Sequence, residues 1–394
     1  MMERPIVEEI RSNISQNLPL IHAIVGPRQT GKTTAAQQVA ETSGITVHWS
    51  AADEAWSAGA GWLRTQWEYA RQLSKANNAR TLLVVDEIQK ANRWSEAVKH
   101  LWDEDRRLGN KVTVMILGSS SLLIQQGLSE SLAGRFLLYR CQHWGFAEMR
   151  SAFGMSLDEW LYFGGYPGAA PLRPNHKLWR SYIMDSLIDA TINRDILQIQ
   201  TVAKPALFRN LFMTALGLPA QIVSYNKLLG QLQDAGNTTT LAHYLHLLET
   251  AFLISGLAQF RMGRLMKRSS SPKIAVWNNA LVNASQPETF EVARANGPWW
   301  GRIVENAVGL HLLNSLERIT KTVYYWRDRD DEVDFVVKTA TGLYAIEVKS
   351  GHTRNINGLS AFCTAYPAAR PYVIGADGIP LESFFATDPN ALFV

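Results

Sequence analysis

An eight-residue stretch near the start of the chain has the spacing of a phosphate-binding loop. It reads Gly26, Pro27, Arg28, Gln29, Thr30, Gly31, Lys32 and Thr33, which fits the pattern G-x-x-x-x-G-K-[ST] in full. In this pattern glycines let backbone N–H groups close around phosphates, the lysine reaches the β and γ oxygens, and the threonine hydroxyl is a ligand for Mg²⁺. The next helix, expected to begin near Thr33 with Thr34 in its first turn, points its positive end at the anion. The sequence therefore predicts a site for ATP and Mg²⁺.

Two adjacent carboxylates follow an apolar run further along the chain. Thr81 to Val85 is rich in β-branched residues, and Asp86 and Glu87 come directly after it. In a nucleotide-hydrolysing site the first carboxylate holds Mg²⁺, usually through water, and the second polarises the attacking water. Solvated loop carboxylates are the alternative for such a pair in isolation. Together with the phosphate-binding loop, the pair predicts ATP hydrolysis with Asp86 at the metal and Glu87 as the catalytic residue.

A third polar cluster ends another apolar run, Val112 to Leu117. Gly118, Ser119, Ser120 and Ser121 follow it. Ser119 is placed where a side chain can sense the γ-phosphate or orient water. A serine cluster after a strand is also typical of an ordinary turn, so both interpretations stay open here.

Length and composition bound the remaining possibilities. The 394 residues, 46% of them apolar, provide core material for two or three domains. Cys141 and Cys363 lie far apart, so neither a disulfide framework nor a thiolate metal site is indicated. We expect a cytoplasmic protein without membrane contact, because there is no signal-peptide core and no apolar run approaches the roughly 18 residues of a membrane span. The net charge of +4 permits nucleic-acid binding without requiring it.

Apolar runs alternate with helical patterns over residues 1–150, which predicts an α/β domain with a parallel sheet covered by helices on both faces. Its expected strands are Ile21–Val25, Thr46–Ser50, Thr81–Val85, Val112–Leu117 and Phe136–Cys141.

Helical patterns replace this alternation in the middle of the chain. Residues 151–204 predict a helical lid or linker, in which Gly164 to Pro167 is a break and Leu178–Ile199 is one long helix. Residues 205–285 predict a winged helix, because a short helix, a turn, a capped helix and a β-hairpin follow one another. The expected elements are helices over Leu207–Leu216, Tyr225–Leu232 and Thr240–Ile254, with Thr238 or Thr239 as cap, and a strand over Ile274–Trp277.

Positive charges gather in the predicted hairpin. No Asp or Glu lies between Glu249 and Glu288, whereas Arg261, Arg264, Lys267, Arg268 and Lys273 do. Clustered cations at a wing would contact DNA phosphates. The alternative is a solvated basic loop, or one that pairs with an acidic neighbour.

A second set of chemically capable residues lies in the last part of the chain, residues 286–394. Expected strands over Thr322–Trp326, Phe335–Lys338 and Leu343–Val348 place Glu347 and Lys349 on one face, since residues two apart in a strand share a face. Asp334 precedes the middle strand and can lie beside Glu347. Two carboxylates and an ammonium suit metal-assisted phosphodiester hydrolysis, and Glu305, on an expected helix over Trp300–Leu316, can complete the metal site. A surface ion pair is the alternative interpretation.

These motifs together resemble one family nearly end to end. The family is that of bacterial and archaeal AAA-plus class ATPases, which join a P-loop domain to a winged helix and a restriction-endonuclease-like domain. Its motifs are similar to seven segments of this chain: GPRQTGKTT, LLVVDEIQK, LGSSSLL, SLAGR, GGYP, VDFVV and IEVKS. The resemblance implies an α/β fold with a P-loop NTPase parallel sheet core, a winged-helix middle and a C-terminal nuclease-like α/β domain. It also implies that Arg135 of SLAGR faces nucleotide, and that Asp334, Glu347 and Lys349 form a PD-(D/E)xK site.

The implied function is an ATPase coupled to a DNA-binding, Mg²⁺-dependent nuclease-like domain, with DNA as partner and self-association into a homo-oligomer allowed. The alternative is an ATP-driven switch or scaffold that binds nucleic acid or protein without cleaving it. One segment departs from the family, which has K-I-Y-x-x-D-x-G-L. Here Asn278 and Ala280 stand in place of the Asp and the Gly.

Overall fold

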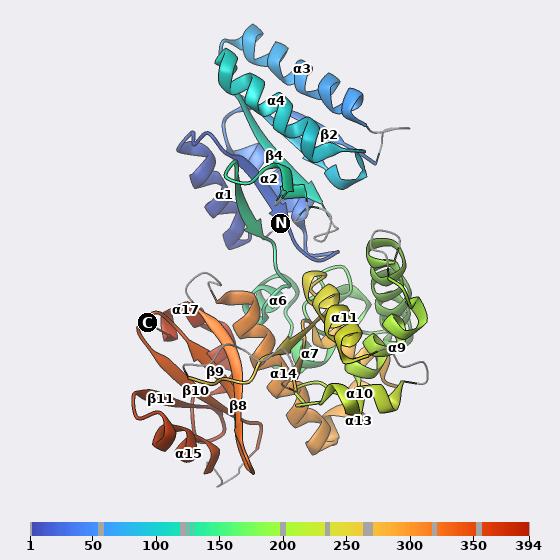
Figure 1. Ribbon diagram of the computed structural model, residues 1–394, viewed down its shortest axis with the longest axis vertical. Helices are drawn as coiled ribbons and strands as arrows, with labels where there is room; N and C mark the ends of the chain where they lie inside the picture. Colours follow the sequence, from blue (N-terminus) through green and yellow to red (C-terminus); the bar gives the residue numbers. More distant parts are fainter. Residues whose placement is uncertain are drawn as a thin grey trace. The chain divides into compact units, whose positions relative to one another are not determined.

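The computed structural model describes residues 2–53, 59–118, 124, 127–128, 130–197, 202–232, 237–262, 271–316, 321–351 and 357–393. Two compact units make up the chain, an N-terminal unit of residues 1–142 and a C-terminal unit of residues 143–394. Figure 1 shows a sheet and helices in each of them. Among the described residues, no helix combines the length and the apolar character that crossing a membrane requires.

Five parallel strands form the sheet of the N-terminal unit, in the order β2-β3-β4-β1-β5. They are β1 (Ile21–Val25), β2 (Thr46–Ala51), β3 (Thr81–Asp86), β4 (Val112–Gly118) and β5 (Phe136–Arg140). The five predicted strands are confirmed to within one residue. Their near-continuous apolar runs are typical of parallel strands that are buried on both faces. The predicted α/β fold with a parallel P-loop NTPase core is therefore confirmed.

Helices cover both faces of this sheet (Figure 1). They are α1 (Pro5–Ser15), α2 (Lys32–Thr42), α3 (Ala60–Asn77) and α4 (Trp94–Leu108), with a short 3-10 turn, η1 (Ile88–Lys90), after β3. Successive strand residues point to opposite faces. As a result Leu83 and Val85 pack with α3 and α4, whereas Leu82 and Val84 pack with α1 and α2.

Short helices open the C-terminal unit. They are α6 (Phe146–Phe153), α7 (Leu157–Phe163), η2 (Ala170–Leu172) and α8 (His176–Ser181), followed by the π-helical segments η3 (Tyr182–Asp189) and η4 (Thr191–Ile196). The prediction of one regular helix over Leu178–Ile199 is wrong, because the backbone hydrogen bonds change from the α-helical to the π-helical pattern after Ser181. Residues 198 and 199 lie outside the described residues.

Three helices and a hairpin follow: α9 (Pro205–Leu216), α10 (Tyr225–Gln231), α11 (Thr238–Thr250), β6 (Ile254–Leu257) and β7 (Lys273–Val276). The predicted cap at Thr238 or Thr239 is wrong. Asn237 caps α11, since its side chain accepts a hydrogen bond from the backbone N–H of Thr240. β6 and β7 pair antiparallel, and Ile222, between α9 and α10, forms a bridge to Lys273 on the other side of β7.

A second sheet, ordered β11-β10-β9-β8, ends the chain. Its elements and flanking helices are α12 (Asn279–Ser285), α13 (Phe290–Ala295), α14 (Gly297–Ser315), β8 (Thr322–Asp328), β9 (Asp331–Lys338), β10 (Leu343–Lys349), α15 (Asn357–Ala365), β11 (Ala369–Gly375), α16 (Leu381–Ala386) and α17 (Pro389–Leu392). β8, β9 and β10 pair antiparallel and β10 pairs with β11 in parallel. The three strands predicted after residue 320 are confirmed, with β8 and β9 longer than expected.

Candidate functional site

The phosphate-binding loop leaves β1 and ends at the first turn of α2. Gly31 precedes this helix with φ of 84°, a left-handed conformation that glycine adopts without strain. Gly26 has a different reason to be glycine, because a Cβ there would lie 2.1 Å from the carbonyl oxygen of Cys141. The loop therefore lies at the carboxyl edge of the parallel sheet with a helix N-terminus facing it, where α/β proteins bind phosphate.

Lys32 is buried at the base of this loop. Its ammonium donates hydrogen bonds to the carbonyl oxygens of Gly26, at 3.0 Å, and Pro27, at 2.5 Å. Burial lowers the pKa of Lys32. A desolvated ammonium beside backbone N–H donors gains strongly from an anionic partner, so Lys32 is positioned for phosphate recognition.

Arg4 and Cys141 support the loop from outside the motif. The buried guanidinium of Arg4 donates to the carbonyl oxygen of Thr30, at 3.0 Å, and to the sulfur of Cys141, at 3.1 Å. The hydroxyl of Thr30 lies 3.0 Å from the Pro27 carbonyl oxygen and 3.1 Å from that of Cys141. Sequence reasoning missed Arg4, because an arginine before a helix-starting Pro5 carries no signal of a contact with a residue so distant in sequence.

Thr33 and Asp86 meet across the sheet edge. The Thr33 hydroxyl donates to a carboxylate oxygen of Asp86 at 2.8 Å. β1 and β3 both pair in parallel with β4, so the loop after β1 and the end of β3 open on the same edge of the sheet. Burial raises the pKa of Asp86, while the hydrogen bond from Thr33 acts against that shift. A threonine hydroxyl and a carboxylate are oxygen ligands suited to Mg²⁺, so this pair fits a metal ion that accompanies ATP.

Glu87 is held in an unusual backbone conformation beside this pair. Its φ is 50°, in the left-handed region, and its N–H donates to the other carboxylate oxygen of Asp86 at 2.8 Å. The side-chain amide of Gln89 donates to the Glu87 carboxylate. Strain of this kind costs about 1–3 kcal/mol and is concentrated at functional sites. Sequence reasoning missed the positioning contact from Gln89, although the signal was present two residues after Glu87.

Two other predicted nucleotide residues do not join this group. Ser119 lies outside the described residues. Arg135 lies at the amino end of β5, where its neighbour Phe136 pairs with Ile21, the first residue of β1. The phosphate-binding loop follows the last residue of β1, roughly 16 Å further along the strand direction. The Arg135 guanidinium instead forms a two-point ion pair with Asp103, with N–O distances of 3.0 and 3.3 Å.

In the C-terminal unit, the predicted carboxylates lie close together. The Asp334 carboxylate accepts a hydrogen bond from the backbone N–H of Val348 at 2.8 Å, and the Lys349 ammonium donates to Glu347 at 2.6 Å. Burial and the negative charge of Asp334 raise the pKa of Glu347 to about 7 and that of Glu305 to about 8. These shifts show that the carboxylates are crowded in a desolvated place.

The charge at the centre of this group comes from Lys273, the first residue of β7. Its ammonium lies 2.5 Å from Glu305, 3.2 Å from Glu332 and 3.4 Å from Asp334. Burial acts to lower the pKa of Lys273, but these carboxylates outweigh it and the pKa is raised. Among the residues that the structure describes, no three His, Cys, Asp or Glu side chains are arranged to hold a metal ion. Two residues of the predicted metal set, Glu305 and Asp334, thus form ion pairs with a lysine, whereas the third, Glu347, pairs with Lys349.

The predicted basic wing also has to be corrected at Lys273. Lys273 has no exposed surface, so it cannot meet DNA phosphates. Arg261 is exposed and donates to the side chain of Gln259. The other three cations of that cluster, Arg264, Lys267 and Arg268, lie outside the described residues.

Comparison with known sequence families identifies the N-terminal unit. Residues 19–150 match a family described as an AAA domain. This match covers the phosphate-binding loop, the Asp86–Glu87 pair and all five strands of the parallel sheet. The N-terminal unit is an AAA-type P-loop ATPase domain. Residues 155–289 and 300–381 of the chain match two domains of unknown function, DUF8612 and DUF4143. No curated protein matches the chain.

Solved structures similar to this chain are distant in sequence. The Walker-type ATPase PABY2304 of Pyrococcus abyssi is 11% identical, with a TM-score of 0.49 over 72% of this chain and 96% of its own. The ORC2 protein of Aeropyrum pernix, in ADPNP and ADP complexes, is 14% identical, with a TM-score of 0.43 over 64% and 85%. The Thermotoga maritima RuvB Holliday junction branch migration motor is 17% identical, with a TM-score of 0.32 over 66% and 91%. Similarity this low carries no information on substrate or partner.

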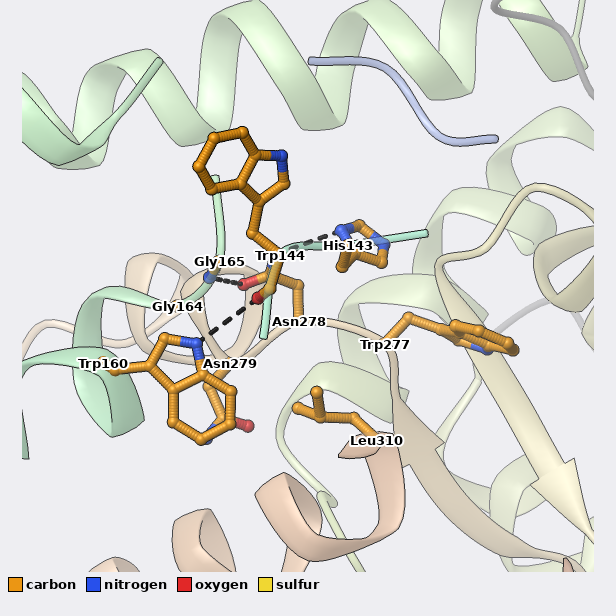
Figure 2. Close-up of a pocket in the computed structure, with 9 residues that line it drawn as sticks. All are labelled: His143, Trp144, Trp160, Gly164, Gly165, Trp277, Asn278, Asn279 and Leu310. Carbon is orange, nitrogen blue, oxygen red and sulfur yellow. Dashed lines mark hydrogen bonds between the residues drawn. The ribbon is translucent and has the colours of Figure 1, made fainter. Parts of the chain in front are cut away.

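Asn278 joins three segments of the C-terminal unit (Figure 2). Its side-chain oxygen accepts hydrogen bonds from the N–H groups of Gly165 and Ala280, each at 3.1 Å, and so caps α12. Its amide lies 3.1 Å from Nδ1 of His143, whose other ring nitrogen lies 3.1 Å from the carbonyl oxygen of Phe252. The Asn therefore preserves a capping and anchoring role that an Asp could perform.

Replacing Asn278 with alanine is expected to lower the free energy of unfolding by about 3 kcal/mol, since one cap and two buried polar partners are lost together. Urea denaturation followed by circular dichroism measures the loss. Asn278→Asp keeps the acceptor for Gly165 and Ala280 and should lose clearly less. Equal losses in both variants would show that this acceptor does not stabilise the unit.

Proposed function

We propose that the AAA ATPase binds ATP with Mg²⁺ at the phosphate-binding loop and works as an ATP-driven switch. The observation that carries this proposal is the Thr33–Asp86 hydrogen bond, which joins the loop to the carboxylate at the end of β3. Thr33 and Asp86 would hold the metal ion, which neutralises charge on the phosphates when bound. Lys32 would contact the β and γ oxygens, with the backbone N–H groups from Arg28 to Thr34 around the phosphates.

In this proposal Glu87 polarises the attacking water. Its backbone is fixed by the hydrogen bond to Asp86 and its carboxylate by Gln89, so the acceptor is already positioned before water arrives. Loss of the γ-phosphate would then release contacts made by the loop and by Asp86, as in other nucleotide switches.

We propose that Arg135 acts on the nucleotide of a neighbouring copy. Within its own chain it lies at the opposite edge of the sheet from the loop, and an arginine side chain cannot span roughly 16 Å. Its ion pair with Asp103 and its place 5.8 Å from the ring of Trp102 hold the guanidinium at the domain surface, 30% exposed. This proposal requires the chain to self-associate.

Replacing Arg135 with alanine is expected to lower ATP turnover by about 100-fold or more while leaving ATP affinity unchanged, as for other arginine fingers. Steady-state phosphate release and calorimetry with a non-hydrolysable ATP analogue measure the two effects. Mixing Arg135→Ala with Lys32→Ala chains should restore part of the turnover, because each then supplies the group that the other lacks. Turnover that stays normal in the single variant, or that mixing fails to restore, contradicts action between copies.

DNA stays a prediction as the partner of the switch. The pairing of Ile222 with β7 beside β6 supports the winged-helix interpretation of residues 205–285, since it adds a third strand to the hairpin. α11, the helix before the hairpin, contains no Lys or Arg, and its exposed side chains are Thr238, Thr239, His243, His246 and Glu249. Phosphate contacts dominate DNA affinity, so this helix alone is poorly suited to bind DNA.

Metal-dependent DNA cleavage is not part of the proposed function. The residues predicted for it, Asp334, Glu347 and Lys349 with Glu305, are close enough to act together, but the ammonium of Lys273 lies among them. A lysine ammonium that contacts Glu305 and Asp334 lies where a divalent metal ion would have to bind, so the cluster does not fit such an ion.

A further inference from the structure

Lys273 connects the β6–β7 hairpin to the carboxylates of the last sheet. It is fully buried, and three carboxylates lie within 3.4 Å of its ammonium: those of Glu305 on α14 and of Glu332 and Asp334 on β9. The ring of Phe335 lies 5.1 Å from the same ammonium. Such a complete set of negative and aromatic neighbours is the environment of a tightly bound cation.

The backbone holds this lysine in place from two sides. Lys273 pairs with Leu257 of β6 on one side and with Ile222 on the other. Beyond β6 the chain pairs with β8, where the N–H of Phe260 donates to the carbonyl oxygen of Tyr325 at 2.6 Å. Phe260 then packs in the core of the last sheet. These pairings fix the backbone of Lys273, while burial and three ion pairs hold its ammonium in place.

Both oxygens of Asp334 and one oxygen of Glu347 are already engaged, which leaves few oxygens for a metal ion. One oxygen of Asp334 faces Lys273, and the other accepts the N–H of Val348. One oxygen of Glu347 accepts from Lys349, while the buried second oxygen has no hydrogen-bond partner among the residues that the structure describes. A divalent ion binds carboxylate oxygens at about 2.0–2.6 Å and would lie within a few Å of the ammonium, where like charges repel.

We propose that Lys273 is the permanent cation of this cluster and that it excludes divalent metal ions, so the C-terminal unit does not cleave phosphodiesters by a metal-dependent reaction. Among the described residues these carboxylates offer no metal site in their present arrangement, but without the ammonium they would be free to regroup around a metal ion. With Lys273→Met, a side chain of similar length without charge, Glu305, Asp334 and the free oxygen of Glu347 would be left to bind one hard divalent cation. This inference does not depend on the proposed ATP switch.

The test is a titration of the full chain with Mn²⁺ alone, without nucleotide, followed by calorimetry and by the electron paramagnetic resonance signal of free Mn²⁺. All proteins carry Asp86→Asn, which removes the candidate metal ligand of the ATPase site. The background protein should show no Mn²⁺ site that depends on Asp334. Adding Lys273→Met should create one Mn²⁺ site per chain, and adding Asp334→Asn to that variant should abolish it.

Two results would overturn the inference. The first is a Mn²⁺ site in the background protein that disappears with Asp334→Asn. The second is a folded Lys273→Met variant that gains no Mn²⁺ site. Removal of one partner from a buried ion pair can prevent folding, so thermal melting is recorded for each variant. If Lys273→Met does not fold, the test compares the background protein with its Asp334→Asn derivative. Equal Mn²⁺ binding by these two proteins supports the inference, whereas a Mn²⁺ site that the derivative lacks contradicts it.

Discussion

Replacing Lys32 with alanine is expected to weaken ATP binding by about 100-fold or more and to abolish turnover. The loss corresponds to about 3 kcal/mol, the scale of removing one partner from a buried charge pair. The physical reason is that the Lys32 ammonium is buried at the base of the phosphate-binding loop, and no other side chain within the loop motif except that of Arg28 carries positive charge. Calorimetry with ATP in the presence of Mg²⁺ measures the affinity directly.

Lys99, an exposed lysine of α4, provides the matched control. Lys99→Ala removes the same charge from the same unit and should change neither affinity nor turnover. Thermal melting of Lys32→Ala separates loss of binding from loss of fold. A folded Lys32→Ala protein that binds ATP as the unaltered chain does would reject the site.

Replacing Glu87 with glutamine is expected to reduce ATP turnover by about 100- to 10,000-fold, the contribution of a positioned general base, and to leave ATP bound. The substitution keeps the shape of the side chain and an oxygen that can accept from Gln89, but it removes the negative charge that polarises water. Single-turnover hydrolysis of radiolabelled ATP measures the chemical step, and filter binding measures retained nucleotide.

Glu96, on the first turn of α4 and paired with Arg93 at the surface, is the control position. Glu96→Gln should hydrolyse ATP at the normal rate. Normal turnover in Glu87→Gln would instead assign the water-activating role elsewhere. Loss of both binding and turnover would mean that Glu87 shapes the loop rather than the chemical step.

Sequence alone determined the parts of this protein that are local. The phosphate-binding loop, the Asp86–Glu87 pair and the parallel strands follow from glycine spacing, apolar runs and the residues that end them, because each depends on neighbours within a few positions. The strands of the last sheet were predicted from the same local pattern, but the sequence did not show their order in the sheet.

Tertiary structure decided which side chains meet. The carboxylates around Asp334 read as a metal site, because their spacing is compatible with one and nothing in the sequence places Lys273 among them. The same holds for Arg4 at Thr30 and for Asn278 at Gly165. Each contact joins residues that are far apart in the chain, and the free energy of burying a charge or an amide depends on that distant partner. A sequence pattern shows which groups are present, whereas only the folded chain shows how each charge is neutralised.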